Sequence, residues 1–233
     1  MRPFTDRTFV DRVTAGRELA ALLGQYKHQP DVLVLGLPRG GLPVAFEIAQ
    51  ALHAPLDVMI VRKLGAPGQP ELAIGAVASG GVTVINEDVL AAFEDFEAIE
   101  RVQAMERLDL ERRERAYRGG RPPLTAKGRT VVLVDDGAAT GATMLAAVRA
   151  VRKLEAKRVV VALPVASTAA YEMLSREADE VICVSVPPGF YAVGQWYIDF
   201  TQTTDEEVRE LLARAERLAL HAQRPASSQT AAR

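Results

Sequence analysis

The sequence predicts a three-layer α/β/α fold, with helices on both faces of a mainly parallel central sheet, and three observations lead to this class. Short apolar runs alternate with stretches of helical spacing along most of the chain, as they do in successive βαβ units. The run 130–134, TVVLV, is apolar or β-branched at every position, which is typical of a strand buried on both faces. Loops rich in small residues follow several runs, at the place where open α/β sheets bind ligands.

Hydrophobic periodicity assigns the core elements in chain order. In the first part of the chain we expect a helix over 11–26, a strand over 32–35, a helix over 43–52 and a strand over 56–61. After the strand at 130–134 we expect a helix over 142–154, a strand over 159–163, a helix over 168–176 and a strand over 181–186. The core of the domain is therefore expected over about 30–65 and 128–186.

An insertion over about 66–120 interrupts this alternation. Two β-prone runs within 72–85 flank Ser79-Gly80-Gly81, a turn that predicts a hairpin. Apolar residues three apart in the charged stretch 88–118 predict a long helix with a narrow apolar stripe, formed by Phe93, Phe96, Ile99, Val102 and Met105. The end of this helix and the linker 119–128 carry five arginines, Arg112, Arg113, Arg115, Arg118 and Arg121. Because Glu111 and Glu114 interleave with them, a solvated helix face is favoured over a nucleic-acid surface.

The C-terminal part begins with a capping box of Thr204 and Glu207, which predicts a helix over 204–222. Its apolar face consists of Val208, Leu211, Leu212, Ala215 and Leu218. The small, polar residues 223–233 are expected to form a disordered tail. Residues 1–205 are then one domain, which ends in a small hood over 187–203.

The composition limits the classes of function. The 233 residues include 28 Lys and Arg against 30 Asp and Glu, a formal net charge of −2, so we expect no nucleic-acid partner. The single cysteine, Cys183, lies in an apolar run and is expected to pack in the core. No apolar run approaches the roughly 18 residues that span a bilayer, and the first residues lack the apolar region of a signal peptide. We therefore expect a cytoplasmic protein without a membrane partner.

The loop 135–143, DDGAATGAT, has the chemistry of a sugar-phosphate site. Gly137 and Gly141 allow a tight turn and the close approach of an anion, and hydroxyl groups and helix N–H groups can bind a phosphate there. Asp135 and Asp136 should instead accept hydrogen bonds from neutral hydroxyls, because like charges repel. The sequence lacks the lysine of a P-loop and the G-x-G-x-x-G of a dinucleotide site. An ordinary strand-to-helix turn is the alternative interpretation.

Two further segments carry positive charge near this edge of the predicted sheet. Pro38-Arg39-Gly40-Gly41 follows the first strand, and its backbone N–H groups and Arg39 suit a phosphate group. Arg62 and Lys63 end the strand 56–61 and would face the same crevice. The composition of 66–71, APGQPE, suggests a loop that closes over the ligand as a lid. A plain turn and a solvated strand end are the alternatives.

Aromatic residues gather beyond the last strand, within 187–200. They are Phe190, Tyr191, Trp196 and Tyr197, and they suggest a stacking platform for a planar ligand. The core of a small subdomain is an equally good explanation.

The loop DDGAATGAT resembles the phosphoribosyl pyrophosphate (PRPP) signature of the type I phosphoribosyltransferases, and other elements of that family appear in the expected order. The resemblance implies that Asp135 and Asp136 hold the ribose 2′- and 3′-hydroxyls and that 138–143 hold the 5′-phosphate. The PRGG segment and the Arg62-Lys63 pair resemble elements of the family that bind pyrophosphate. The implied PRPP-binding residues are Arg39, Gly40, Gly41, Arg62, Lys63, Asp135, Asp136, Gly137, Ala138, Ala139, Thr140, Gly141, Ala142 and Thr143. Of these, Asp135, Asp136, Arg39 and Lys63 are the implied catalytic residues.

The segment PPGFYAVGQWYIDF resembles the hood of purine phosphoribosyltransferases, which implies acceptor binding by Phe190, Tyr191, Trp196 and Asp199. Two departures disfavour a 6-oxopurine acceptor. Those enzymes carry a lysine after the strand that corresponds to 159–163, where this chain has Pro164-Val165-Ala166, and an arginine where it has Thr201-Gln202-Thr203. The acceptor is left open.

The resemblance implies a magnesium-dependent glycosyltransferase of the pentosyltransferase class, with a place in nucleotide metabolism such as purine or pyrimidine salvage. It would transfer ribose 5-phosphate from PRPP to a nitrogen nucleophile and release pyrophosphate. Mg²⁺ would be held mainly through PRPP, with Asp135 or Asp136 as a protein ligand. A homodimer is compatible with the resemblance.

No general base stands out in the sequence. His28, His53 and His221 fall at helix ends or in the tail, and Glu71 and Asp199 are the candidates that remain. A regulatory protein of the same fold that binds PRPP without turnover is the alternative function. Because the basic residues of the predicted pyrophosphate elements are retained and the chain has no basic excess, the enzyme is favoured.

Overall fold

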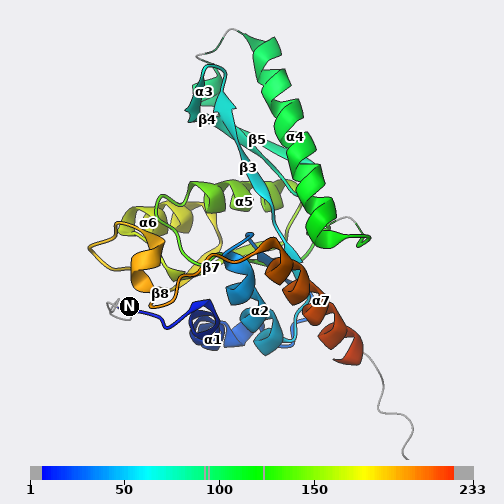
Figure 1. The fold of residues 1–233 in the computed structure, drawn as a ribbon, viewed down its shortest axis with the longest axis vertical. Helices are drawn as coiled ribbons and strands as arrows, with labels where there is room; N and C mark the ends of the chain where they lie inside the picture. The colour runs from blue at the N-terminus through cyan, green and yellow to red at the C-terminus, as the bar shows by residue number, and fades with distance from the viewer. Residues whose placement is uncertain (1–6, 92, 94, 123, 223–233) are drawn as a thin grey trace, which may run out of the picture.

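The computed structural model describes residues 7–91, 93, 95–122 and 124–222, and five parallel strands form its central sheet. The strand order is β2-β1-β6-β7-β8 (Figure 1). The strands are β1 (Val32–Gly36), β2 (Leu56–Val58), β6 (Thr130–Val134), β7 (Arg158–Val165) and β8 (Glu180–Ser185). The predicted tail 223–233 lies outside the described residues.

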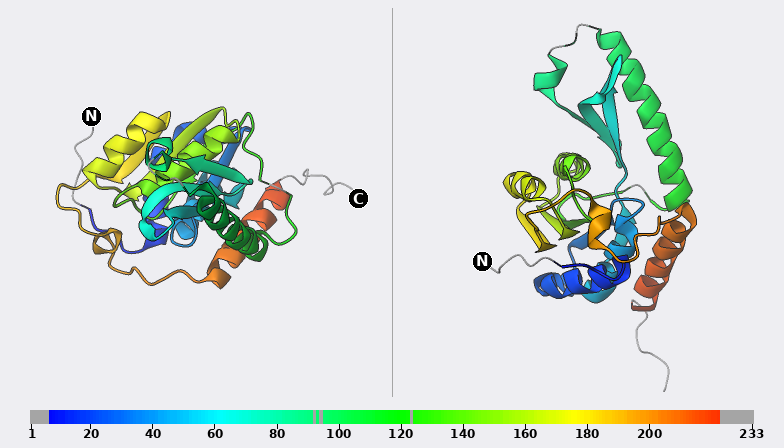
Figure 2. Two further views of the ribbon diagram at one scale, coloured as in Figure 1. Left: turned by 90° about the horizontal axis from the view of Figure 1, so that it is seen from above. Right: turned by 60° about the vertical axis from the view of Figure 1, so that its left-hand side comes forward.

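Helices cover both faces of this sheet, as the two views in Figure 2 make plain. One face packs on α1 (Arg12–Leu22), α2 (Gly41–Leu52) and α7 (Asp205–Ala222), and the other packs on α5 (Ala142–Lys153) and α6 (Thr168–Glu177). Alternate residues of each strand point to opposite layers, so Val32 and Val34 join one core and Leu33 and Leu35 the other. The predicted three-layer α/β/α class is confirmed.

The insertion forms an arm of three antiparallel strands and a long helix that projects from the core (Figures 1 and 2). The strands are β3 (Val61–Ala66), β4 (Gln69–Ala78) and β5 (Val82–Ile85), and the predicted hairpin around Ser79-Gly80-Gly81 joins the last two. The helices are α3 (Glu87–Leu90) and α4 (Phe96–Arg118). Two short helical segments, η1 (Gly24–Tyr26) and η2 (Val193–Trp196), complete the fold.

Three sequence-based boundaries were wrong. The predicted strand 56–61 divides into β2 and β3, which belong to different sheets, so Arg62 and Lys63 lie inside β3 and not at the end of a parallel strand. The predicted helix 88–118 divides where the Asp95 side chain accepts a hydrogen bond from the Ala98 N–H and begins α4. The helix predicted over 11–26 ends at Leu22, before η1.

The segment 66–71, predicted as a closing loop, is a hairpin connection between β3 and β4. Gly68 has a φ of +72°, which suits the tight turn at the tip. Backbone pairing therefore runs through most of the expected lid, and only two residues lie outside the strands.

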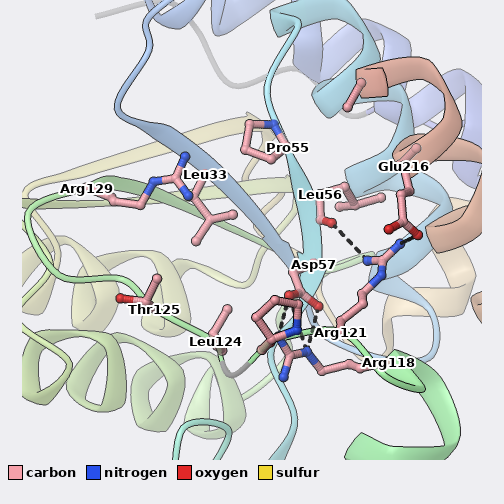
Figure 3. A pocket seen from close by; sticks show the side chains of 13 residues that line it. Leu33, Pro55, Leu56, Asp57, Arg118, Arg121, Leu124, Thr125, Arg129 and Glu216 are labelled. Atoms are coloured by element: carbon pink, nitrogen blue, oxygen red, sulfur yellow. Dashed lines mark hydrogen bonds and ion pairs between the residues drawn. The ribbon is translucent and has the colours of Figure 1, made fainter. Parts of the chain in front are cut away.

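Arg118 fastens the base of the arm to the core at the edge strand β2. Its guanidinium donates to Asp57 with distances of 2.8 Å and 3.0 Å, and to the Pro122 carbonyl at 2.7 Å. Arg121 donates to the Leu212 carbonyl of α7 at 2.7 Å. Figure 3 shows Arg118 and Asp57 facing each other beside a cavity of about 290 Å³. The side chains of Arg118 and Asp57 are only 9% and 14% exposed, so the pair is almost enclosed.

We predict that Arg118→Met lowers the free energy of unfolding by about 3 kcal/mol, because removal of one partner leaves the Asp57 carboxylate buried without compensation. Urea denaturation at neutral pH measures this loss. The matched control is Arg101→Met, which breaks the 3.6 Å ion pair with Glu97, where the two side chains are 65% and 88% exposed. That control should stay within experimental error, and equal losses in the two variants would contradict the anchoring role.

Candidate functional site

Two loops meet at the carboxyl end of the sheet because β1 and β6 are neighbours in register, with Gly36 opposite Val134. The glycines of the first loop lie directly against the acidic pair that follows β6. A Cβ added to Gly40 would lie 2.0 Å from Asp136 Oδ2, and one added to Gly41 would lie 2.7 Å from the Val134 carbonyl oxygen. This approach leaves no room for a side chain at either glycine.

Asp135 and Asp136 lie side by side in surroundings that penalise charge. Burial and the neighbouring Asp136 carboxylate raise the pKa of Asp135 well above its ordinary value. Burial also raises the pKa of Asp136, although Arg12 opposes this with an ion pair of 2.8 Å from Nε to Oδ2. The Arg12 and Asp136 side chains are 11% and 14% exposed. Asp136 is thus the member of the pair with a cation, and Asp135 is the member that more readily holds a proton.

Arg12 also connects this pair to the hood, and no sequence motif identified it. Its Nη1 donates to the Thr201 carbonyl at 2.7 Å, and its guanidinium carbon lies 3.9 Å from the centre of the Phe200 ring. The Tyr197 hydroxyl donates to the Asp136 carbonyl at 2.6 Å. Arg12 and Asp136 are 124 positions apart in sequence, so local spacing carries no signal for their contact.

The predicted phosphate loop is fixed at its base and open at its tip. Ala138 N–H donates to the Val165 carbonyl at 3.0 Å, and the Ser167 hydroxyl donates to the Ala139 carbonyl at 2.6 Å. Gly141, with a φ of +74°, begins α5. The residues at the tip are exposed: Ala139, Thr140, Ala142 and Thr143. Helix α5 therefore presents its first N–H groups toward solvent beside a rigid loop, an arrangement that suits an anion.

The predicted basic residues do not all lie together. Arg39 adjoins the glycines beside Asp136 and lines a cavity between its own loop, α4 and α7. Arg62 turns to the arm helix instead, where its Nε lies 2.9 Å from Glu106 and 3.3 Å from Asp109. The exposed Lys63 is the next residue of β3.

The hood aromatics divide between packing and exposure. The Phe190 and Trp196 rings lie 6.2 Å apart and pack against the buried cluster around Phe9 and Tyr197. Tyr191 is 91% exposed. Phe190, Trp196 and Tyr197 thus contribute to a subdomain core, and Tyr191 is accessible to a ligand.

The remaining candidates lie in different settings. Asp199 is exposed and accepts hydrogen bonds from the N–H and hydroxyl of Thr201, which lower its pKa. His28 and His53 stack with ring centres 4.4 Å apart; His53 caps the C-terminal end of α2, the end opposite the loop glycines. The side chains of Glu71 and His221 lie outside the described residues. Cys183 is largely buried, and burial raises its pKa to about 12, so its thiol stays protonated.

Asp135 and Asp136 are the acidic side chains that could contribute to a metal site at these loops. Within the described parts of the chain, no group of three or more His, Cys, Asp or Glu side chains forms a ready-made metal cluster. A hard cation such as Mg²⁺ needs few protein ligands when substrate phosphates supply the others. Among the described residues, no helix has the length and apolar character needed to cross a membrane.

Comparison with known proteins identifies the family of the chain. The model of the phosphoribosyl transferase domain matches residues 11–200. In Mycobacterium tuberculosis, strain H37Rv, the protein named "Putative phosphoribosyl transferase Rv0571c" is 48% identical over 212 residues, which are 91% of this chain and 48% of that protein. The chain thus spans about half the length of the curated relatives it matches.

A solved structure, that of TT1426 from Thermus thermophilus, is 48% identical to this chain. The match covers 89% of this chain and 98% of that one, with a TM-score of 0.80. The resemblance seen in the sequence motifs is confirmed, and the chain belongs to the phosphoribosyltransferase family.

Proposed function

We propose that the chain transfers ribose 5-phosphate from PRPP to a nitrogen nucleophile and releases pyrophosphate. The observation that carries the proposal is the contact of Gly40 with Asp136, which joins a glycine-rich anion loop to an acidic pair and a helix N-terminus at one edge of the sheet. Rupture of the C1–O bond creates positive charge on the sugar and negative charge on the leaving pyrophosphate. A site with carboxylates at one position and cationic donors at the next suits both charges.

The acidic pair is proposed to bind the ribose. Its carboxylates would accept hydrogen bonds from the 2′- and 3′-hydroxyls and stabilise the positive charge that develops on the sugar. Arg12 acts as a positioning residue, because its ion pair orients Asp136 without being part of the loop. Asp135 or Asp136 would also contribute a ligand to Mg²⁺ held mainly through PRPP, and the ion would neutralise charge on the leaving diphosphate.

The loop 138–143 is proposed to hold the 5′-phosphate. The exposed Thr140 and Thr143 lie beside the first N–H groups of α5, so hydroxyl and backbone donors are available to one anion. Arg39 and the amides of Gly40 and Gly41 would face the pyrophosphate. Arg62 and Lys63 would assist from β3, after a rearrangement that frees Arg62 from Glu106.

The hood is proposed to bind the acceptor through Phe190, Tyr191 and Trp196, with Asp199 nearby. The exposed Tyr191 ring is the accessible surface for stacking on a planar base. A nucleobase acceptor would place the enzyme in nucleotide salvage.

The decisive experiment measures PRPP consumption with Mg²⁺ against purine, pyrimidine and pyridine acceptors, beside calorimetry of PRPP binding alone. Release of pyrophosphate with one class of acceptor supports the enzyme and names that class. PRPP binding without turnover for any acceptor would favour the regulatory protein. Absence of PRPP binding would overturn both.

We predict that Gly40→Ala weakens PRPP binding by at least about tenfold, because the new methyl group displaces the Asp136 carboxylate. The φ of Gly40 is −61°, which suits alanine, so the effect is steric and not conformational. Calorimetry with PRPP measures it. Gly24→Ala is the control, since a Cβ there meets no atom within 4 Å. Equal affinities in the two variants would argue against a ribose site at Asp136.

A second prediction contrasts the two carboxylates. Because the pKa of Asp135 is raised, its contribution to stability decreases as pH rises from the ordinary carboxyl pKa of 3.8 through the raised value. Asp135→Asn should therefore stabilise the ligand-free protein at pH 7, by about 1 kcal/mol, while it lowers kcat about a hundredfold. Asparagine keeps an oxygen for the 2.9 Å hydrogen bond from the Asp136 N–H.

Asp136→Asn is the matched comparison and should have the opposite effect on stability, because it leaves Arg12 buried without its carboxylate. Urea unfolding of the wild type and both variants at pH 7 gives the sign of each change in the free energy of unfolding. Repeating the measurement from pH 4 to pH 8 follows the titration of the carboxyl groups. If Asp135→Asn were the less stable of the two at pH 7, the proposed protonation of the pair would be wrong.

A further inference from the structure

A cavity of about 260 Å³ lies directly beside the glycine loop, between that loop, α4 and the start of α7. Figures 1 and 2 place the C-terminal end of α4 next to the first turn of α7. Three arginines and one carboxylate are among its lining residues, which are Arg39, Arg112, Arg113, Ala116, Tyr117 and Asp205. Two of these arginines belong to the helix face that the sequence assigned to solvent.

The α4 arginines depend on one carboxylate for compensation. Arg113 Nε lies 2.9 Å from Asp109 Oδ2, and Arg112 binds the other oxygen of the same group. Asp109 also lies 3.3 Å from Arg62. Arg62 also pairs with Glu106 at 2.9 Å, so these three guanidinium groups share two carboxylates and keep a local excess of one positive charge.

Asp205 is the carboxylate among the lining residues, and its Oδ1 already accepts a hydrogen bond from a neutral group. The Tyr117 hydroxyl donates to Asp205 Oδ1 at 2.6 Å, and burial raises the pKa of Tyr117 to about 12, so the phenol remains a donor. Arg39 Nη1 is 3.9 Å from the same oxygen, beyond hydrogen-bond range. An anion in the cavity could therefore bind Arg39 without breaking a short ion pair.

The cavity at the amino end of the sheet provides a contrast. There the arginines already donate to protein oxygens at close range: Arg118 to Asp57 (Figure 3), and Arg121 and Arg129 to the carbonyls of Leu212 and Val32. That cavity is a structural junction. In the other cavity Arg112 and Arg113 share Asp109, and Arg39 lies beyond hydrogen-bond range of Asp205.

We propose that Arg39, Arg112 and Arg113 bind a diphosphate group in this cavity. The volume is below the roughly 300 Å³ at which pockets for drug-sized molecules begin, and it suits a small, highly charged anion. One guanidinium group can donate two parallel hydrogen bonds to a phosphate group. Three such groups carry enough positive charge to bind an anion with several negative charges. The cavity adjoins the proposed PRPP site, because Gly40, the residue after Arg39, lies against Asp136. The diphosphate is therefore either the one carried by PRPP or that of a separate ligand.

The test is calorimetry of inorganic pyrophosphate, without Mg²⁺ so that arginines are the available cations. We expect binding to the wild type and a loss of at least about tenfold in affinity for Arg112→Gln/Arg113→Gln. The control is Arg101→Gln on the same helix, whose side chain is 65% exposed and pairs with Glu97, and it should bind as the wild type does. No binding to the wild type, or equal affinity in the double variant, would overturn the proposal.

A parallel titration with PRPP distinguishes the source of the diphosphate, and only this arm rests on the proposed function. If the double variant loses affinity for PRPP as well, the cavity holds the diphosphate of the donor. If its affinity for PRPP is unchanged while that for pyrophosphate falls, the cavity serves a separate diphosphate ligand. Pyrophosphate binding by a wild type that does not bind PRPP would remove the proposed function and leave the diphosphate site.

Discussion

The ion pair between Arg12 and Asp136 is the interaction on which the rest of the site depends. Two adjacent carboxylates in a nearly closed environment are costly, because each loses hydration and repels the other. Arg12 offsets this cost for one of them at 2.8 Å. Asp136 can then remain charged against Gly40, where no side chain would fit. The charged Asp136 thus depends on Arg12 of α1, and its position depends on the absence of a side chain at Gly40.

This dependence extends to the hood. Arg12 reaches the Thr201 carbonyl and the Phe200 ring, while Tyr197 donates to the backbone of Asp136. Segments from both ends of the domain therefore converge on one residue of the central loop. A change in the ionisation or the occupancy of the acidic pair would act on the hood through short, enclosed contacts. We therefore expect ligand binding at the acidic pair, the proposed ribose site, to be coupled to the order of the hood.

Local signals predicted most of the fold, and long-range contacts account for what they missed. The strand 130–134 and the capping box of Thr204 and Glu207 were predicted correctly, because adjacent residues determine burial periodicity and helix caps. The division of 56–61 between two sheets depends on pairing with β4, which no residue in that run encodes. Arg12 was missed for the same reason, since its partner is distant in sequence.

The arginines of α4 show how a correct local interpretation can still be incomplete. Alternating charges on a helix do indicate a solvated face, and Arg112 is indeed 75% exposed. The packing of α4 against the start of α7 nevertheless brings two of these charges to the side of the cavity where Arg39 lies. Helix periodicity determines which residues share a face, but only the tertiary fold determines what that face meets. Once β3 is in place, Arg62 adds a third guanidinium group beside Asp109 and Glu106. One positive charge is then in excess on the helix whose Arg112 and Arg113 line the same cavity as Arg39.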